Sequence, residues 1–361
     1  MSSQIETRSG SAEPVAEWHD DVAAIAREWD ELADRAGAAP FLRPGWLVAW
    51  LGAWGESPRI LALRERGELR AVLPLVRERG VLSGPANSHT PLAGAVADDP
   101  SYLRQLAQAV VAARAPRTDL RSLDPSDPLV AEMRAAALAR GLSMIERVTD
   151  REPYVELQDS FEEYEAGLPR KHRKEMRRLR RRLEDEGEVT VEFADGRERL
   201  GELLEEGFAI EGSGWKTDAG SAIVAVPKAH RFYREIAGWA AARGWLRLAF
   251  LRLDGRPLAF DFCLEMGGTF YALKGGYDVE FRRFGPGALL TYESLRHASE
   301  NGLTSYEFLG TDDPYKLNWT STTRERARLQ IFSRTPAGRL QDAAWRYGRP
   351  LVKRAQRRLG R

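Results

Sequence analysis

The sequence predicts an α+β fold in which helices flank a mixed β-sheet. In the second half of the chain the expected order is a strand, two helices, three antiparallel strands, a helix and a last strand. Asp254-Gly255, the strongest hairpin dipeptide present, joins the first two strands of the meander, and the last strand is expected to lie parallel to the third. A chain of 361 residues is long for a single hydrophobic core, so its length predicts two domains.

The first half predicts helices arranged around a β-hairpin. Arg66-Gly67-Glu68 joins two strand-like runs as a tight turn, and Pro74 indicates an edge position or a bulge in the second run. The expected elements are helices from about residue 20, after Pro44, at 100–114 and at 127–140, and strands at 59–63, 69–76, 120–123 and 142–148.

The second half begins with a capping box at Ser160 and Glu163, whose side chains satisfy free amides at a helix start. The expected elements are a basic helix at 170–183, a strand at 189–193, helices over 200–208 and from Pro227 to Gly244, strands at 246–253, 258–266 and 269–277, a helix ending at Asn301-Gly302, and a strand at 304–309. Residues 311–324, rich in Asp, Thr and Pro, do not predict a helix.

The two hairpins show a short internal repeat. Leu63-Arg64, Gly67 and Ala71 match Leu251-Arg252, Gly255 and Ala259 at a constant offset, although any two hairpins rich in Arg and Leu would show some likeness. We interpret the match as a tandem duplication. The expected division is a loose leader at 1–17, a first domain at 18–155, a second domain at 156–335 and a basic tail at 336–361.

A glycine-rich segment between the third strand of the meander and the next helix is the main candidate binding motif. Its spacing from Arg282 is Arg-x-x-Gly-x-Gly-Ala, and Pro286 suits the first turn of a helix. Glycine allows a close approach of the backbone, and the first amides of a helix favour an anion. The segment therefore predicts a phosphate cradle rather than a plain surface turn. The candidate residues are Arg282, Arg283, Phe284, Gly285, Pro286, Gly287 and Ala288.

Four segments, in this order, resemble the GNAT superfamily of acyltransferases, and in particular the tandem-GNAT, CelD-like acetyltransferases, which are related to the FemAB-type transferases. The segments are 40–46, 211–216, Arg282-x-x-Gly285-x-Gly287 and Asp313-Pro314-Tyr315-Lys316, so the resemblance covers residues 40 to about 332. It implies two tandem GNAT-like domains, of which the first is degenerate and the second uses acetyl-CoA or another acyl-CoA as co-substrate.

The resemblance implies an N-acyltransferase in which an amine attacks the thioester directly. The expected reaction is acetyl transfer to an amine on a small molecule or on a cell-envelope or polysaccharide precursor. Two alternatives stay open. One is a FemAB-like transferase that uses aminoacyl-tRNA, and the other is a non-catalytic scaffold in polysaccharide biosynthesis.

This chemistry requires a general base, donors for the oxyanion and a proton for the leaving thiolate. Glu211, at the end of a helix, is the preferred base, although a solvated carboxylate is an equally good interpretation; Asp261, Asp278 and Asp312 are alternatives. Tyr315 is the nearest candidate acid. Tyr277, Asp278 and Val279 are expected to bond the pantetheine amides. Acceptor contacts are expected from Trp215, Lys216, Lys274 and Lys316.

Composition excludes several other classes of protein. The 54 basic and 53 acidic residues give a net charge of +1, the single Cys263 excludes an internal disulfide, and five scattered His show no metal-ligand spacing. The chain has no uninterrupted apolar span of 18 residues, so we expect a cytoplasmic protein, with the inner face of the membrane as a possible peripheral location. The basic helix at 170–183 and the tail at 345–361 either face solvent or contact RNA or an anionic membrane.

Overall fold

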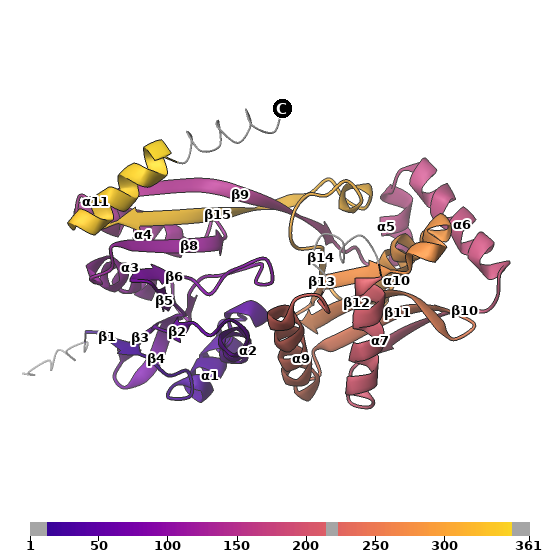
Figure 1. Cartoon of the computed structure of the whole chain (residues 1–361), viewed down its shortest axis with the longest axis horizontal. Coiled ribbons are helices and arrows are strands. Elements are labelled where there is room, and N and C mark those ends of the chain that lie inside the picture. The colour runs from indigo at the N-terminus through magenta and orange to yellow at the C-terminus, as the bar shows by residue number, and fades with distance from the viewer. Residues whose placement is uncertain (1–12, 214–222, 349–361) are drawn as a thin grey trace, which may run out of the picture.

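The computed structural model describes residues 13–213 and 223–348, and it confirms the α+β fold with a mixed sheet. The two halves of the chain lie side by side, and the long strands β9 (Ser143–Glu156) and β15 (Thr323–Phe332) run between them (Figure 1). In this part of the chain, no helix is both long enough and apolar enough to cross a membrane.

The described strands form two sheets. In the eleven-stranded sheet the order is β10 (Val189–Ala194), β11 (Leu246–Leu253), β12 (Arg256–Met266), β13 (Thr269–Tyr277), β14 (Ser305–Glu307), β9, β15, β8 (Arg117–Leu123), β6 (Val81–Ser83), β5 (Val76–Glu78) and β2 (Ser57–Pro58). The four-stranded sheet contains β1 (Val15–His19), β3 (Ile60–Glu65), β4 (Glu68–Leu73) and β7 (Val96–Ala97). As predicted, β14 is parallel to β13.

Helices cover both faces of the second-half sheet. They are α5 (Phe161–Gly167), α6 (Arg170–Glu184), α7 (Leu200–Gly212), α9 (Pro227–Ala242) and α10 (Pro286–Glu300). Phe208 of α7 and Phe232 of α9 share a core with Phe260 and Phe262 of β12. The alternate residues of the same strand, such as Cys263, pack in a second core with α5, α6 and α10. The sheet therefore has an α7 face and an α10 face.

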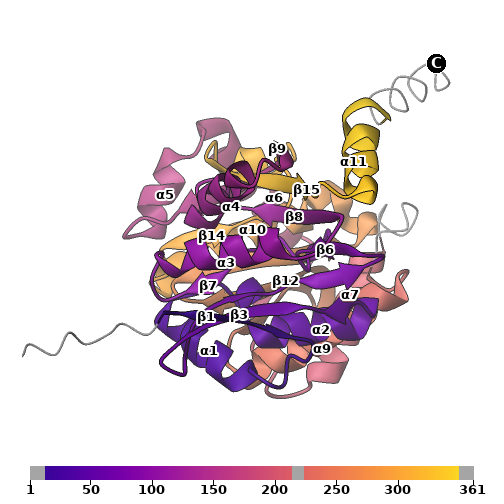
Figure 2. The ribbon, with the colours of Figure 1, turned by 90° about the vertical axis from the view of Figure 1, so that its left-hand side faces the viewer.

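The first half has its own helices around the four-stranded sheet. They are α1 (Ala26–Arg35), α2 (Pro44–Trp54), α3 (Tyr102–Ala112) and α4 (Pro128–Ala139), and α3 packs on β3 and β4 with α4 beside it (Figure 2). The predicted boundaries of α2, α3 and α4 are close to these. The last described elements are α11 (Pro336–Ala343) and the short helix Ala344–Gly348.

Three boundaries differ from the prediction. Strand β1 starts at Val15 and pairs with β3, so residues 15–17 do not belong to a loose leader. Pro74 separates β4 from β5, and β9 extends to Glu156. Strand β15, which was not expected, pairs with β8 and β9 of the first half. The predicted second domain, 156–335, therefore includes a strand that pairs with strands of the first half.

Strand β15 alternates apolar and polar residues as a half-buried strand does, but two of its charged residues do not face solvent as that pattern implies. Arg326 and Arg328 are buried, at 7% exposure each, instead of facing solvent. The Arg326 guanidinium bonds the Glu152 carboxylate at 2.7 Å, and Arg328 bonds Asp119. Buried charges are tolerated only when they are paired in this way.

The two hairpins named in the internal repeat share an irregularity as well as a sequence match. Leu63 lies opposite Ala71, Leu251 lies opposite Ala259, and in each hairpin the register shifts at the next residue. The turn glycines have φ of +84° and +80°. A common register shift at matching positions supports the interpretation of a tandem duplication.

Helix α2 of the first half packs on α9 of the second half without space for a side chain at Gly45, because an added Cβ would overlap the Trp239 indole. The Gly45→Ala variant is therefore expected to lose about 1–3 kcal/mol of unfolding free energy through overpacking. Gly238→Ala, on the exposed side of α9 with no atom within 4 Å, is the matched control and should gain about 0.5–1 kcal/mol. Urea unfolding measures both, and equal effects would contradict the close packing of α2 on α9.

Candidate active site

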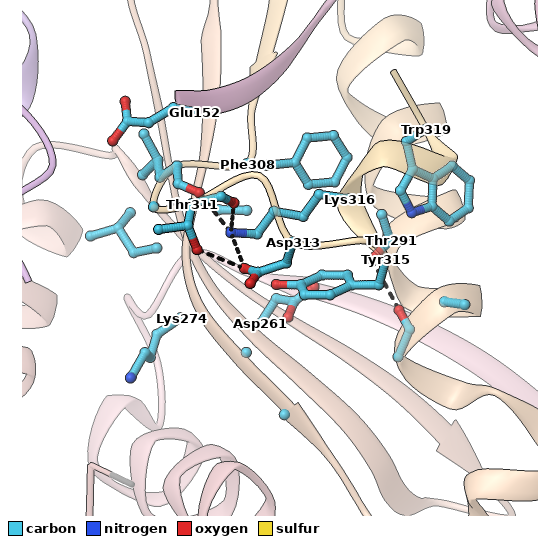
Figure 3. Close-up of a pocket in the computed structure, with 18 of the residues that line it drawn as sticks. Glu152, Asp261, Lys274, Thr291, Phe308, Thr311, Asp313, Tyr315, Lys316 and Trp319 are labelled. Atoms are coloured by element: carbon cyan, nitrogen blue, oxygen red, sulfur yellow. Dashed lines mark hydrogen bonds and ion pairs between the residues drawn. The ribbon is translucent and has the colours of Figure 1, made fainter. Parts of the chain in front are cut away.

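The main cavity lies where β13 and β14 part. The two strands pair only over Thr269–Tyr271 and Ser305–Glu307, after which β13 continues and the chain beyond β14 turns away. The turn uses positive φ at Leu309 and Gly310, +55° and +68°. The resulting opening holds a cavity of about 890 Å³ (Figure 3).

The cavity opens to both faces of the sheet. Asp261 of β12 alternates with Phe260 and Phe262, which belong to the α7 face, and so it points to the α10 face. Glu211 reaches the cavity from the end of α7, on the opposite face. Because both carboxylates line one cavity, two ligands can approach each other through the sheet from opposite sides.

The predicted phosphate cradle lies on the α10 face. Gly285 precedes α10 with φ +60°, Pro286 is the first helical residue, and the Leu289 amide donates to the Gly285 carbonyl at 3.0 Å. The amides of Gly287 and Ala288 therefore fall in the first turn, where an α-helix offers no internal acceptor. The exposed Arg282 lines the cavity beside them.

The other residues of the predicted cradle divide between cavity and core. Tyr277 and Val279 line the cavity. Phe284 is buried in the core on the α10 face, and Arg283 lies over its ring and bonds Glu186 at 3.4 Å. Neither Phe284 nor Arg283 lines the cavity, so the structure corrects their assignment as direct contacts.

Asp278, predicted to bond the pantetheine amides or to act as a base, has other residues of the protein as its partners. Its amide donates to the Leu258 carbonyl at 2.8 Å, which keeps it in the sheet. Its carboxylate accepts from the Glu280 amide at 3.0 Å and from Arg256 at 2.6 Å, and it is buried outside the cavity. Asp278 therefore fixes the turn between β13 and the 3₁₀ helix η2 (Val279–Phe284), and it is neither a base nor an oxyanion donor.

Glu211 is buried at 1% exposure, so the interpretation as a solvated carboxylate is wrong. Its Oε2 accepts from the Ile223 amide at 2.8 Å, and the Lys274 ammonium lies 3.8 Å from its Oε1. The end of α7 can approach β13 this closely because residue 276 is glycine: a Cβ there would lie 2.6 Å from the Glu211 Cα. Glu211 and Lys274 are thus brought together at the α7 end of the cavity.

Tyr315 and Asp261 meet on the α10 face. Tyr315 as a whole residue is 60% exposed, but its hydroxyl points inward, toward Asp313 and Asp261, where it is shielded from solvent (Figure 3). Burial and these two carboxylates raise the pKa of the Tyr315 hydroxyl, so it carries a proton at neutral pH. Asp312, the other predicted base, is exposed and does not line the cavity, whereas its neighbour Asp313 does.

Lys316 has a different role from the predicted acceptor contact. Its ammonium donates to the carbonyls of Leu309 at 2.8 Å and Thr311 at 2.9 Å, and it pairs with Asp313 at 3.0 Å. These three partners match the three protons of an ammonium group. Lys316 therefore holds residues 309–316, the loop that carries Tyr315. As expected, residues 311–324 contain no α-helix, only the 3₁₀ turn Lys316–Asn318.

The first half contributes a wall that the sequence did not predict. The loop 87–91 lines the cavity, and His89 Nδ1 lies 3.4 Å from the Tyr233 hydroxyl. Burial and the Lys274 charge lower the pKa of His89 to about 4, so its ring is neutral at neutral pH. The only sequence signal was the turn-rich composition of this loop, since nothing links residue 89 to the second half.

Glu152 and Arg326 form a second unpredicted part of the wall. Burial raises the pKa of Glu152 to about 7, although its ion pair with Arg326 acts in the opposite direction. Trp215 and Lys216, predicted to contact the acceptor, lie outside the described residues. Residues 13–213 and 223–348 contain no group of three or more His, Cys, Asp or Glu side chains arranged for a metal ion.

The start of α10 and Tyr315 line this cavity on one face of the sheet, and the buried Glu211 lines it on the other, an arrangement suited to group transfer. Residues 170–317 match the family model of the GNAT acetyltransferase domain. The second half of the chain therefore carries a GNAT acetyltransferase domain, and the prediction of an acyltransferase is confirmed.

Solved structures share the fold over nearly the whole chain. FemX has a TM-score of 0.62 at 16% identity, covering 91% of this chain and 99% of FemX. The C-terminal domain of a putative lysylphosphatidylglycerol synthetase from Agrobacterium fabrum has a TM-score of 0.57 at 13% identity, covering 90% of this chain and 96% of that domain. A conserved protein of unknown function from Bacteroides thetaiotaomicron has a TM-score of 0.52 at 14% identity, with coverages of 88% and 100%. No curated protein sequence matches the chain significantly.

Proposed function

We propose that the protein is an acyl-CoA-dependent N-acyltransferase that transfers an acetyl group from acetyl-CoA to an amine. The observation that carries the proposal is the start of α10, where the Gly287 and Ala288 amides and Arg282 face the gap between β13 and β14. A pyrophosphate group suits this helix terminus because amides and dipole both favour an anion there. The acceptor is an amine on a small molecule or on a cell-envelope or polysaccharide precursor.

The thioester would reach the gap along β13. From the cradle, a pantetheine chain can extend back along the edge of β13 that β14 leaves after Tyr271, and bond it as an added strand. Leu273 is an extra residue there, since Phe262 faces Lys274 and Cys263 faces Ala272. Such a bulge turns backbone groups out of the ladder. We place the thioester carbonyl at this bulge, where a backbone amide can face the oxyanion.

The acceptor would enter from the α7 face. Glu211 takes a proton from its ammonium group, and the amine nitrogen attacks the thioester carbon. As the new C–N bond forms and the C–S bond breaks, Tyr315 donates its proton to the sulfur, and the second proton that the nitrogen loses restores the Tyr315 hydroxyl. Lys274, His89 and Tyr233 surround Glu211 and would position the acceptor.

Calorimetric titration with acetyl-CoA tests the donor site. The parent protein is expected to bind in the micromolar range, and Gly287→Glu is expected to abolish binding because its carboxylate would occupy the anion site. Gly201→Glu is the matched control: Gly201 is also the second residue of a helix, α7, but does not line the cavity. Absence of binding by the folded parent, or equal loss in both variants, would overturn the proposal.

Aminoacyl-tRNA is the second candidate donor, because the exposed basic surface of α6 adjoins the cavity. Treatment of the reaction mixture with RNase distinguishes the two candidate donors. Transfer from acetyl-CoA should be unaffected, whereas transfer from aminoacyl-tRNA would be lost. A cytoplasmic location, with contact to an anionic membrane through the basic tail at 336–361, belongs to the same proposal.

A further inference from the structure

One side of α6 faces the mouth of the donor side of the cavity. Residues 171, 175, 178 and 182 follow helical spacing along this side. Glu175 lines the cavity. Arg182 donates to the Arg283 carbonyl at 3.4 Å and lies 5.5 Å from the centre of the Phe284 ring, directly before the cradle. Lys171 and Arg178, one turn before and one turn after Glu175, therefore lie on the same side of α6 as this cavity-lining residue.

The other sides of α6 differ in their charge balance. Arg177 pairs with Glu165 of α5 at 3.4 Å, and Arg180 pairs with Glu293 of α10 at 2.8 Å, so acids of neighbouring helices neutralise these two charges. Lys174 and Arg181 are exposed, and helical spacing puts them on a different side of α6 from Glu175.

Positive charge remains in excess at the mouth. The basic residues here are Lys171, Arg178, Arg182 and Arg282, and the one acid on the same side of α6, Glu175, bonds Arg178 at 2.7 Å. The adjoining acid Glu186 bonds Arg283, outside this group. Like charges gathered at one place destabilise the free protein, and a bound anion relieves their repulsion.

We propose that Lys171, Arg178, Arg182 and Arg282 form a second phosphate site, which binds the 3′-phosphate of CoA. The inference rests on the proposed function, in which the start of α10 takes the pyrophosphate and leaves this third phosphate group unaccounted for. Guanidinium groups bind phosphate in a two-pronged manner. A nucleic acid is a poorer fit, because the sole aromatic ring on α6, that of His172, packs against Trp319 and leaves no platform for a base.

Binding of CoA and of dephospho-CoA, which lacks only the 3′-phosphate, tests the site. The full-length parent is expected to bind CoA about tenfold more tightly. Lys171→Glu should remove this preference and leave the affinity for dephospho-CoA nearly unchanged. Lys174→Glu makes the same change of charge on a different side of the same helix and should keep the preference. A glutamate at residue 171 lies in the first turn of α6, where the helix dipole favours an acid, so the fold is expected to persist.

The outcomes separate this site from the donor proposal. Equal binding of the two ligands by the parent would overturn the second phosphate site and leave the pyrophosphate cradle intact. An equal loss of preference in both variants would also overturn it, because only general charge would then matter. Absence of binding of either ligand to the folded parent would remove the CoA proposal, and the second site with it.

Discussion

The Glu211→Gln variant is expected to lose about 10²- to 10⁴-fold in kcat and to bind acetyl-CoA as tightly as the parent. The amide keeps the shape of the side chain, and its oxygen can still accept from the Ile223 amide, but it cannot take a proton at neutral pH. Steady-state rates with the amine that the parent acylates fastest in a screen, together with calorimetry, measure the two quantities.

The pH dependence identifies the step that Glu211 serves. Since a base is needed only for an acceptor that arrives as an ammonium ion, the deficit of the variant should shrink as the pH rises toward the pKa of the amine. Glu202→Gln, an exposed position on the same helix, should behave as the parent. Full kcat in Glu211→Gln would move the role of base to Asp261 or Glu152, which also line the cavity.

Local signals were sufficient to predict the strand, loop and helix that make up the proposed cradle. The strand at 269–277, the glycine loop and the helix that stops at Asn301-Gly302 are all present, since each depends on residues adjacent in sequence. Glycine spacing and Pro286 determine how the backbone presents the Gly287 and Ala288 amides, whatever packs around them. The core of the predicted cradle could therefore be placed from the sequence.

The remaining site residues could not be assigned from the sequence, because their contacts are set by residues that are distant in the chain. Asp278 and Lys316 were expected in contact with ligands, but Arg256 and the carbonyls of residues 309 and 311 occupy them. His89 could not be assigned, because only the packing of the two halves brings it to Tyr233. Whether a charged side chain meets a ligand or another residue is a property of the tertiary structure, and one sequence does not determine it.

This explains why both halves are needed for one cavity. Loop 87–91 and Glu152 of the first half line the cavity, and so do Glu211 and the start of α10 from the second half. The first copy of the duplicated fold has no glycine loop, so it is expected to serve the second copy by shaping the acceptor side. Strand β15, which returns from the second half into the sheet of the first, ties the two together.

Substitution of Gly276, one of two adjacent glycines in β13, is expected to lower both stability and kcat. Gly276→Ala is expected to lower the free energy of unfolding by about 1–3 kcal/mol. It should also reduce kcat by about 10²-fold, the usual consequence of a displacement near 1 Å in a catalytic group. The new Cβ would lie 2.6 Å from the Glu211 Cα and 3.3 Å from its backbone N and C atoms. Because backbone atoms cannot rotate away, the end of α7 must move, and the carboxylate moves with it.

Gly275→Ala is the matched control, since its Cβ would meet chiefly the Asp261 carboxylate, the end of a side chain that can turn aside. We expect a smaller loss of stability and at least tenfold more kcat than in Gly276→Ala. In a double variant, Gly276→Ala should add little to Glu211→Gln, because both changes act on one group. Urea unfolding and steady-state rates distinguish the cases. An equal loss of kcat in the two alanine variants would mean that the position of Asp261 matters as much as that of Glu211, and the proton of the acceptor would then have two possible destinations.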